Sequence, residues 1–201
     1  MIAGILKEPQ GENRVSLLPE QVVALIKKNV QVVVEDGAGH TASAFNEAYV
    51  QAGATIVSRA EALKSDLVLT INPLTDADIP QLKAGAAILG VYQPLFNVDL
   101  MNTWASKNVC SFSLDMIPRT TRAQSMDVLS SQANIAGYRA VLLASTLLPR
   151  YFPMFMTAAG SIAPAKVLIL GAGVAGLQAI ATAKRLGAVV EVFDTRPAVK
   201  E

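Results

Sequence analysis

The chain is short of the residues that most often carry metal and disulfide chemistry. Its 201 residues include one cysteine, Cys110, and one histidine, His40. A single cysteine cannot form an internal disulfide, which fits a reducing compartment, and one cysteine with one histidine cannot build a zinc site, so we expect no metal. We expect Cys110, in an apolar strand-like run, to lie in the core, and His40, in a turn, to lie at the surface.

An excess of charge of either sign is also absent. The sequence has 17 Lys and Arg against 16 Asp and Glu, a formal net charge of +1. The basic residues are scattered and form no stripe, which argues against a nucleic-acid partner. No Gly-x-Ser-x-Gly sequence is present, which argues against a hydrolase built on a serine elbow.

Long uncharged apolar runs are missing too, although 52% of the residues are hydrophobic. Prolines, glycines or charges interrupt every candidate before the roughly 20 residues that a membrane-spanning helix requires. The sequence does not open with a basic segment followed by an apolar one, so we expect no secretory signal. The composition predicts a soluble chain with a substantial core.

What the sequence does contain is a regular alternation of strands and helices. Apolar runs closed by turn residues predict strands at residues 2–6, 30–34, 66–71, 86–92 and 109–116. Helical stretches fall between these runs at residues 19–28, 44–52, 77–83 and 98–107. This alternation predicts an α/β fold with a parallel sheet, flavodoxin-like or Rossmann-like, that is covered on both faces.

A proline-free stretch with apolar residues at helical spacing predicts a long helix at residues 126–148. We therefore expect an N-terminal α/β domain at 1–125, a linking helix and irregular connector at 126–159, and the first half of a Rossmann dinucleotide-binding domain at 160–201. Only seven residues follow Asp194, so we expect this second domain to be truncated.

Residues 167–194 carry the clearest motif. They read VLILGAGVAGLQAIATAKRLGAVVEVFD: an apolar run, a glycine turn, a helix, a second apolar run and an acid. Gly171 permits a tight turn, Gly173 has no Cβ to keep a pyrophosphate away, and Gly176 lets the helix lie close to the sheet. The helix start adds unpaired N–H groups and the positive end of its dipole, which favour phosphates. The motif predicts a dinucleotide site.

Asp194 lies 18 residues after Gly176, close to the roughly 20 expected for the acid that binds a ribose hydroxyl. An acid there favours NAD over NADP, because it repels a 2′-phosphate. A purely structural glycine turn is the alternative, which the agreement of strand, helix and acid disfavours. On the helix between them, we expect Gln178, Thr182 and Arg185 to face water.

Residues 118–132, PRTTRAQSMDVLSSQ, form a second polar stretch, which follows a predicted strand. Arg119, Gln124 and Asp127 could form a polar network where α/β sheets bind ligands, and the Ser130 hydroxyl lies near the start of the long helix. The amide of Gln124 could pair with the carboxamide of nicotinamide. From these residues alone, a helix N-terminus with polar capping residues is the favoured interpretation.

Three segments together resemble a known family: RAQSMDVLSSQANIAGYRAV, GAGVAGLQAIATAKRLGAVV and DTRP. They resemble the NAD(H)-binding component of proton-translocating nicotinamide nucleotide transhydrogenase, the N-terminal region of its alpha subunit. The resemblance runs from Arg14 to Asp194. Alanine dehydrogenase is a related family with the same fold and glycine turn.

The resemblance implies which residues bind NAD(H). A mobile loop with Arg119, Gln124 and Asp127, followed by Ser130, holds the nicotinamide and its ribose. The pyrophosphate site corresponds to Gly171, Gly173, Val174, Ala175 and Gly176. The adenosine ribose site corresponds to Asp194, with Thr195 and Arg196 beside it.

The resemblance also implies partners. NADP(H) is expected on a beta subunit, hydride transfer between NADH and NADP is expected to be coupled to proton passage through a membrane domain, and the NAD(H) component is expected to form a homodimer. The expected location is cytoplasmic, on the face of the inner (plasma) membrane, through this complex.

Alanine dehydrogenase-like activity is the alternative enzyme. Arg14 matches a substrate-binding arginine of that family. However, Asn72 stands near where that family has a substrate lysine, and Gln93 near where it has an acid/base histidine. Hydride transfer between two nicotinamides requires only that the rings be held about 3–3.5 Å apart, so a component of a transhydrogenase can lack both residues. A fragment without activity of its own is a further alternative.

Overall fold

The computed structural model describes residues 1–197 and divides the chain into two compact units. The first is Met1–Met126 and the second begins at Asp127. The long helix predicted at residues 126–148 is present and belongs to the second unit. The predicted domain limits at 125 and 159 stay a prediction, and residues 198–201 of the predicted second domain lie outside the described residues.

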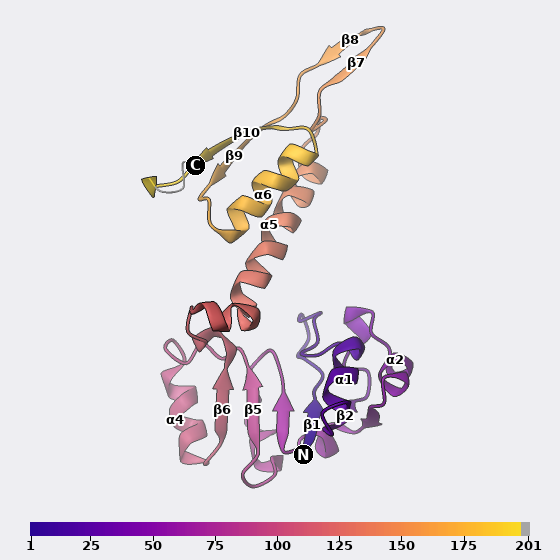
Figure 1. The fold of residues 1–201 in the computed structure, drawn as a ribbon, viewed down its shortest axis with the longest axis vertical. Coiled ribbons are helices and arrows are strands. Elements are labelled where there is room, and N and C mark those ends of the chain that lie inside the picture. The colour runs from indigo at the N-terminus through magenta and orange to yellow at the C-terminus, as the bar shows by residue number, and fades with distance from the viewer. Residues whose placement is uncertain (198–201) are drawn as a thin grey trace. The chain divides into compact units, whose positions relative to one another are not determined.

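The first unit is built on a six-stranded parallel sheet (Figure 1). Its strands are β1 (Ile2–Ile5), β2 (Gln31–Glu35), β3 (Thr55–Val57), β4 (Leu67–Leu69), β5 (Ala87–Gly90) and β6 (Cys110–Ser113). Their order is β3-β2-β1-β4-β5-β6, the order of a doubly wound Rossmann sheet. The predicted α/β fold class is confirmed, and the direction of winding changes between β1 and β4.

Helices cover both faces of this sheet. They are α1 (Pro19–Ile26), α2 (Asn46–Gln51), α3 (Arg59–Ala62) and α4 (Val98–Ser106), with 3-10 turns at His40–Ala42, Ile79–Gln81, Leu114–Met116 and Thr121–Met126. Val22 of α1 and Tyr49 of α2 pack on one face, against Ile5. Trp104 of α4 packs on the other, against Ile88, with its ring edge-on to Tyr92 at a centroid distance of 5.0 Å. Side chains alternate between the two faces along each strand, so both cores draw on the same strands.

Several local predictions for the first unit differ from the structure. The helix predicted at 77–83 is only a 3-10 turn, Ile79–Gln81, with Pro80 in it. Strand β3 and helix α3, three and four residues long, were not predicted because such short elements show no periodicity. The prediction that Cys110 lies in the core is wrong: it is exposed on β6, an edge strand of the sheet. His40 is exposed, as predicted.

A buried acid ties α3 to the loop before the Ile79–Gln81 turn. Arg59 binds both oxygens of Asp78, Nε to Oδ1 and Nη2 to Oδ2 at 2.9 Å each, and also binds Glu35 Oε2 at 2.8 Å. The Asp78 side chain is 5% exposed and also accepts hydrogen bonds from Thr75. The Arg59 guanidinium lowers the pKa of Asp78 to about 2.

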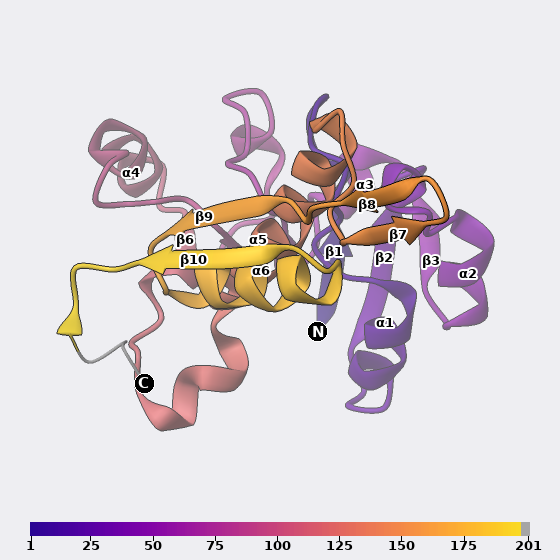
Figure 2. The same cartoon turned by 90° about the horizontal axis from the view of Figure 1, so that it is seen from above.

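The second unit pairs two helices with two parallel strands. It contains α5 (Val128–Leu147), β7 (Phe155–Thr157), β8 (Gly160–Ile162), β9 (Lys166–Leu170), α6 (Val174–Arg185) and β10 (Val189–Phe193). Strands β9 and β10 lie side by side, with α6 against one face (Figure 2). The core joins Val141 of α5, Ile169 of β9 and Ala183 of α6. This is the βαβ arrangement that the glycine motif predicts.

The second unit departs from the predictions in two places. The connector expected to be irregular contains the antiparallel hairpin β7–β8, which projects from the strand pair (Figure 1). The prediction that Thr182 faces water is wrong, because it is 4% exposed. Helix α5 packs along this side of α6, and Asn134 of α5 donates to Gln178 of α6 at 3.2 Å. The apolar spacing along α6 predicts its packing on the sheet, but it does not show that α5 covers another side of the helix.

The Arg59–Asp78 pair predicts a specific loss of stability in acid. Because the folded-state pKa of Asp78 is lowered, its stabilising effect is complete above about pH 4 and is lost as the pH falls towards 2. Asp78→Asn should lower the free energy of unfolding of the first unit by about 1–2 kcal/mol at pH 7, a value reduced for the partial exposure of Arg59. The difference from the unsubstituted protein should shrink between pH 4 and 2. Urea unfolding followed by the fluorescence of Trp104, which lies in the first unit, measures it.

Asp76→Asn is the matched control. Its side chain lies two residues away and is 87% exposed, so the variant should unfold within about 0.5 kcal/mol of the unsubstituted protein. Equal effects of the two substitutions at pH 7 would contradict a stabilising role for the Arg59–Asp78 pair.

Candidate functional site

The glycine turn connects β9 to α6 as the motif requires. Gly171 follows β9 with φ +97°, in the region that favours glycine, and its N–H donates to Phe193 O at 2.7 Å. Gly173 caps the start of α6 with φ −79°, and its carbonyl accepts the N–H of Leu177 at 2.8 Å. The turn is therefore fixed at one end by β10 and at the other by the helix.

Gly176 and Gly173 have different roles in the turn. A Cβ on Gly176 would strike the carbonyl oxygen of Gly171, which is backbone and cannot move aside cheaply. A Cβ on Gly173 would meet no heavy atom within 4 Å. Gly176 is thus required by the fold, whereas the space in front of Gly173 is open to a ligand.

The first turn of α6 offers backbone donors to this space. No side chain caps its start among the described residues, and Val174 is 42% exposed. The first N–H groups of a helix have no partner within the helix and lie at the positive end of its dipole. Val174, Ala175 and Gly176 contribute these groups, an arrangement suited to phosphate oxygens.

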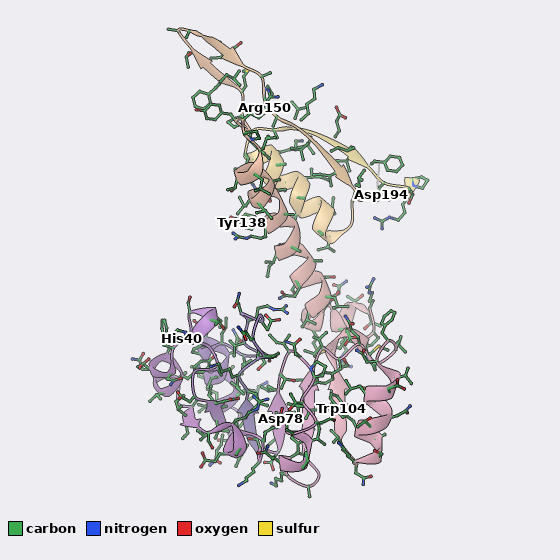
Figure 3. The ribbon with its side chains drawn as sticks, turned by 180° about the vertical axis from the view of Figure 1, so that it is seen from behind. His40, Asp78, Trp104, Tyr138, Arg150 and Asp194 are labelled. Atoms are coloured by element: carbon green, nitrogen blue, oxygen red, sulfur yellow. The ribbon has the colours of Figure 1, made fainter. Side chains whose placement is uncertain are left out.

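Asp194 lies directly beyond β10 (Figure 3). Its Oδ2 accepts the N–H of Ala172 at 2.7 Å, so the acid and the turn are joined by a hydrogen bond. Arg196 binds both carboxylate oxygens, Nε to Oδ1 at 3.0 Å and Nη2 to Oδ2 at 2.9 Å. The Arg196 guanidinium and the Ala172 N–H hold the pKa of Asp194 well below its usual range. Thr195 between them is exposed.

Helix α5 contacts the first turn of α6. A Cβ on Gly137 of α5 would strike the carbonyl oxygen of Ala175 in the first turn of α6, so the two backbones are in close contact there. The sequence reasoning missed Gly137 and Ala172. Gly137 could have been found from its position in the middle of a long predicted helix. Glycine weakens a helix there, so its presence indicates close packing.

The predicted nicotinamide residues are divided between the two units. Arg119 and Gln124 lie in the first unit, and both are exposed. In the second unit, Asp127 caps α5: its carboxylate accepts the N–H of Ser130 at 2.9 Å and the Ser130 hydroxyl at 2.7 Å. The helix-capping interpretation of Asp127 is therefore confirmed.

In the first unit, the carboxylates of Glu8 and Glu12 bind groups of that same unit. Glu8, just after β1, accepts the N–H groups of Ile71 at 2.6 Å and Asn72 at 3.0 Å, and the Asn72 amide at 3.0 Å. Glu12 binds Arg14, Nε to Oε1 at 2.8 Å and Nη2 to Oε2 at 2.6 Å, which lowers the pKa of Glu12 to about 2. Arg14 is thus paired with an acid, and the position expected for a substrate lysine holds an asparagine bound to Glu8.

Comparison with known proteins identifies the family. The model of the alanine dehydrogenase/PNT N-terminal domain matches residues 4–136, and that of the C-terminal domain matches residues 140–201. The chain belongs to the alanine dehydrogenase/PNT family.

Within this family, the chain is 44% identical over its whole length to the NAD(P) transhydrogenase subunit alpha of Haemophilus influenzae, of which it covers 40%. Its structure matches the transhydrogenase from Sinorhizobium meliloti with a TM-score of 0.96 and 44% identity, over 100% of this chain and 60% of that one. It matches an L-alanine dehydrogenase with a TM-score of 0.87 and 26% identity, over 99% and 56%. The chain thus spans about half the length of these family members.

Two further features of the described residues bear on the site. Within residues 1–197, no helix has the length and apolarity needed to cross a membrane. In the same range, no group of three or more His, Cys, Asp or Glu side chains could hold a metal ion.

Substitutions of two glycines should separate the two roles assigned above. Gly176→Ala should lower the free energy of unfolding of the second unit by about 1–3 kcal/mol, since its Cβ must displace backbone. Gly173→Ala, three residues away, should change it by less than about 1 kcal/mol, because its Cβ points into open space. Thermal unfolding followed by circular dichroism measures both, with Trp104 fluorescence recorded alongside to identify the transition of the first unit. Equal losses would contradict the assigned roles.

Proposed function

We propose that this chain is the NAD(H)-binding part of an NAD(P) transhydrogenase alpha subunit. The observation that supports this most directly is the glycine turn, in which Gly173 faces open space and Asp194 is hydrogen-bonded to the turn. A backbone with helix N–H donors and no Cβ fits a pyrophosphate, and an acid at the end of the next strand fits a ribose. The similarity to transhydrogenase alpha subunits favours this over other dinucleotide-dependent functions.

Each part of the cofactor has candidate residues in the chain. Gly171, Gly173 and the first N–H groups of α6 would hold the pyrophosphate, and Asp194 would accept a hydrogen bond from the adenosine ribose. The nicotinamide end would be held by Arg119, Gln124, Asp127 and Ser130. Bound NAD(H) supplies the hydride chemistry. The protein's task is to bind and orient it, and none of these residues is required to act as an acid or base.

The proposal extends to the complex. NADP(H) would be bound by a separate beta subunit, and transfer between the two nucleotides would be coupled to proton passage through a membrane domain. The NAD(H)-binding part would form a homodimer on the cytoplasmic face of the membrane. The name "subunit alpha" of the relatives supports an assembly of several subunits.

Binding of NADH is the first test. The chain should bind NADH saturably, measured by the fluorescence of the reduced nicotinamide, and Gly173→Ala should raise Kd by about tenfold or more, because its Cβ occupies the space proposed for the pyrophosphate. Ser161→Ala, an exposed side chain of β8, is the control and should leave Kd unchanged. Saturable binding that Gly173→Ala does not weaken would mean that the nucleotide binds elsewhere than at the glycine turn.

Hydride transfer is the second test. When the full-length protein is mixed with an NADPH-loaded transhydrogenase beta subunit, an NAD analogue should be reduced, as followed by its absorbance. If NADH binds but no hydride is transferred at any mixing ratio, the protein is a nucleotide-binding module and the transhydrogenase part of the proposal is rejected.

An alanine dehydrogenase-like activity is the second candidate. Arg14 and the similarity to an L-alanine dehydrogenase favour it. The Glu12–Arg14 pair and the Glu8–Asn72 hydrogen bond argue against it, because they occupy the groups that would bind a small substrate. The same protein should therefore form no NADH from alanine and NAD. Alanine-dependent NADH formation would reverse the order of the two candidates.

A further inference from the structure

The acid expected to bind the adenosine ribose already has a full set of hydrogen bonds. Asp194 Oδ1 accepts the backbone N–H of Arg196 at 2.8 Å and its Nε at 3.0 Å. Oδ2 accepts the N–H of Ala172 at 2.7 Å and Nη2 of Arg196 at 2.9 Å. A carboxylate has about four acceptor positions, so all of them are used.

These four donors are not equally easy to displace. The bonds from Ala172 and from the Arg196 backbone are part of the chain path between the glycine turn and the end of β10. The two guanidinium bonds come from a side chain that is 60% exposed, while Asp194 is 11% exposed. A ligand hydroxyl that approaches from solvent would therefore displace the Arg196 guanidinium first.

We propose that Arg196 sets how strongly this site distinguishes NAD(H) from NADP(H). Its guanidinium occupies on Asp194 the acceptor positions that the ribose hydroxyls of NAD(H) would use, so it weakens NAD(H) binding by competition. Once displaced, it stays within a side chain's length of the acid, where it can bind the 2′-phosphate of NADP(H). Arg196 thus makes the preference for NAD(H) over NADP(H) smaller than Asp194 alone would make it.

The chemistry of the two groups supports both halves of this proposal. An ion pair whose arginine is largely exposed is weak and is exchanged readily for a ligand. Guanidinium is planar and binds phosphate oxygens in pairs, and an arginine near the ribose acid is the usual way to accommodate a 2′-phosphate. Asp194 alone would repel such a phosphate, whereas Asp194 paired with Arg196 carries no net charge.

The inference rests on the proposed binding of NAD(H) at the glycine turn, and one set of titrations separates the two. NADH and NADPH are each titrated by nicotinamide fluorescence into the unsubstituted chain, Arg196→Gln and Arg196→Lys. Arg185→Gln, which removes an exposed arginine from the last turn of α6, is the matched control. Thermal unfolding of each variant is recorded alongside.

For Arg196→Gln, Kd for NADH should fall about two- to fivefold, since a weak competing pair is lost, and Kd for NADPH should rise about fivefold or more. For Arg196→Lys, which keeps the charge but not the planar fork, both Kd values should lie between those of the unsubstituted chain and those of Arg196→Gln. Arg185→Gln should leave the ratio of the two Kd values unchanged.

Saturable NADH binding with the same NADH to NADPH ratio in Arg196→Gln and the unsubstituted chain would overturn this inference and leave the proposed function intact. An equal weakening of both nucleotides in Arg196→Gln would also overturn it. If the unsubstituted chain binds neither nucleotide, the proposed function fails and the inference fails with it.

Discussion

The position of α6 depends on two glycines at which a side chain would collide with backbone. Gly176 lies against the Gly171 carbonyl on the turn side, and Gly137 of α5 lies against the Ala175 carbonyl on the other. Interiors are close-packed, so backbone in contact at two points has little freedom to shift. The helix start, whose N–H groups are the proposed phosphate donors, is therefore fixed by contacts that involve no polar side chain.

Much of the fold follows from patterns that need no knowledge of tertiary structure. Runs of apolar residues closed by turns are enough to find five of the six strands of the first unit, and the turn after β9 is readable because Gly171 and Gly176 each meet a geometric need that another residue cannot. What the patterns could not give depends on neighbours distant in sequence. Thr182 is buried because α5 packs beside it, and Cys110 is exposed because β6 is an edge strand.

The candidate site shows the same division. The roles of the glycines and the position of Asp194 could be predicted from spacing. The contacts of Asp194 could not, because they depend on the chain path after β10, which brings Arg196 back onto Asp194 and the Ala172 N–H within 2.7 Å of it. Glu8 was missed for a similar reason: its partners, Ile71 and Asn72, are more than sixty residues away in sequence. The first unit has the Rossmann strand order, and its direction of winding changes between β1 and β4. There the backbone N–H groups of Ile71 and Asn72 bind the carboxylate of Glu8.

The single tryptophan of the chain has a practical consequence. Trp104 lies in the first unit, 1% exposed and edge-on to Tyr92, and the second unit has none. Indole emission therefore reports the packing of the first unit alone, while circular dichroism reports both. A chain of two compact units need not unfold in a single step. Comparison of the two signals during unfolding would show whether the half of the chain that carries the glycine turn keeps its structure after the other half has lost its own.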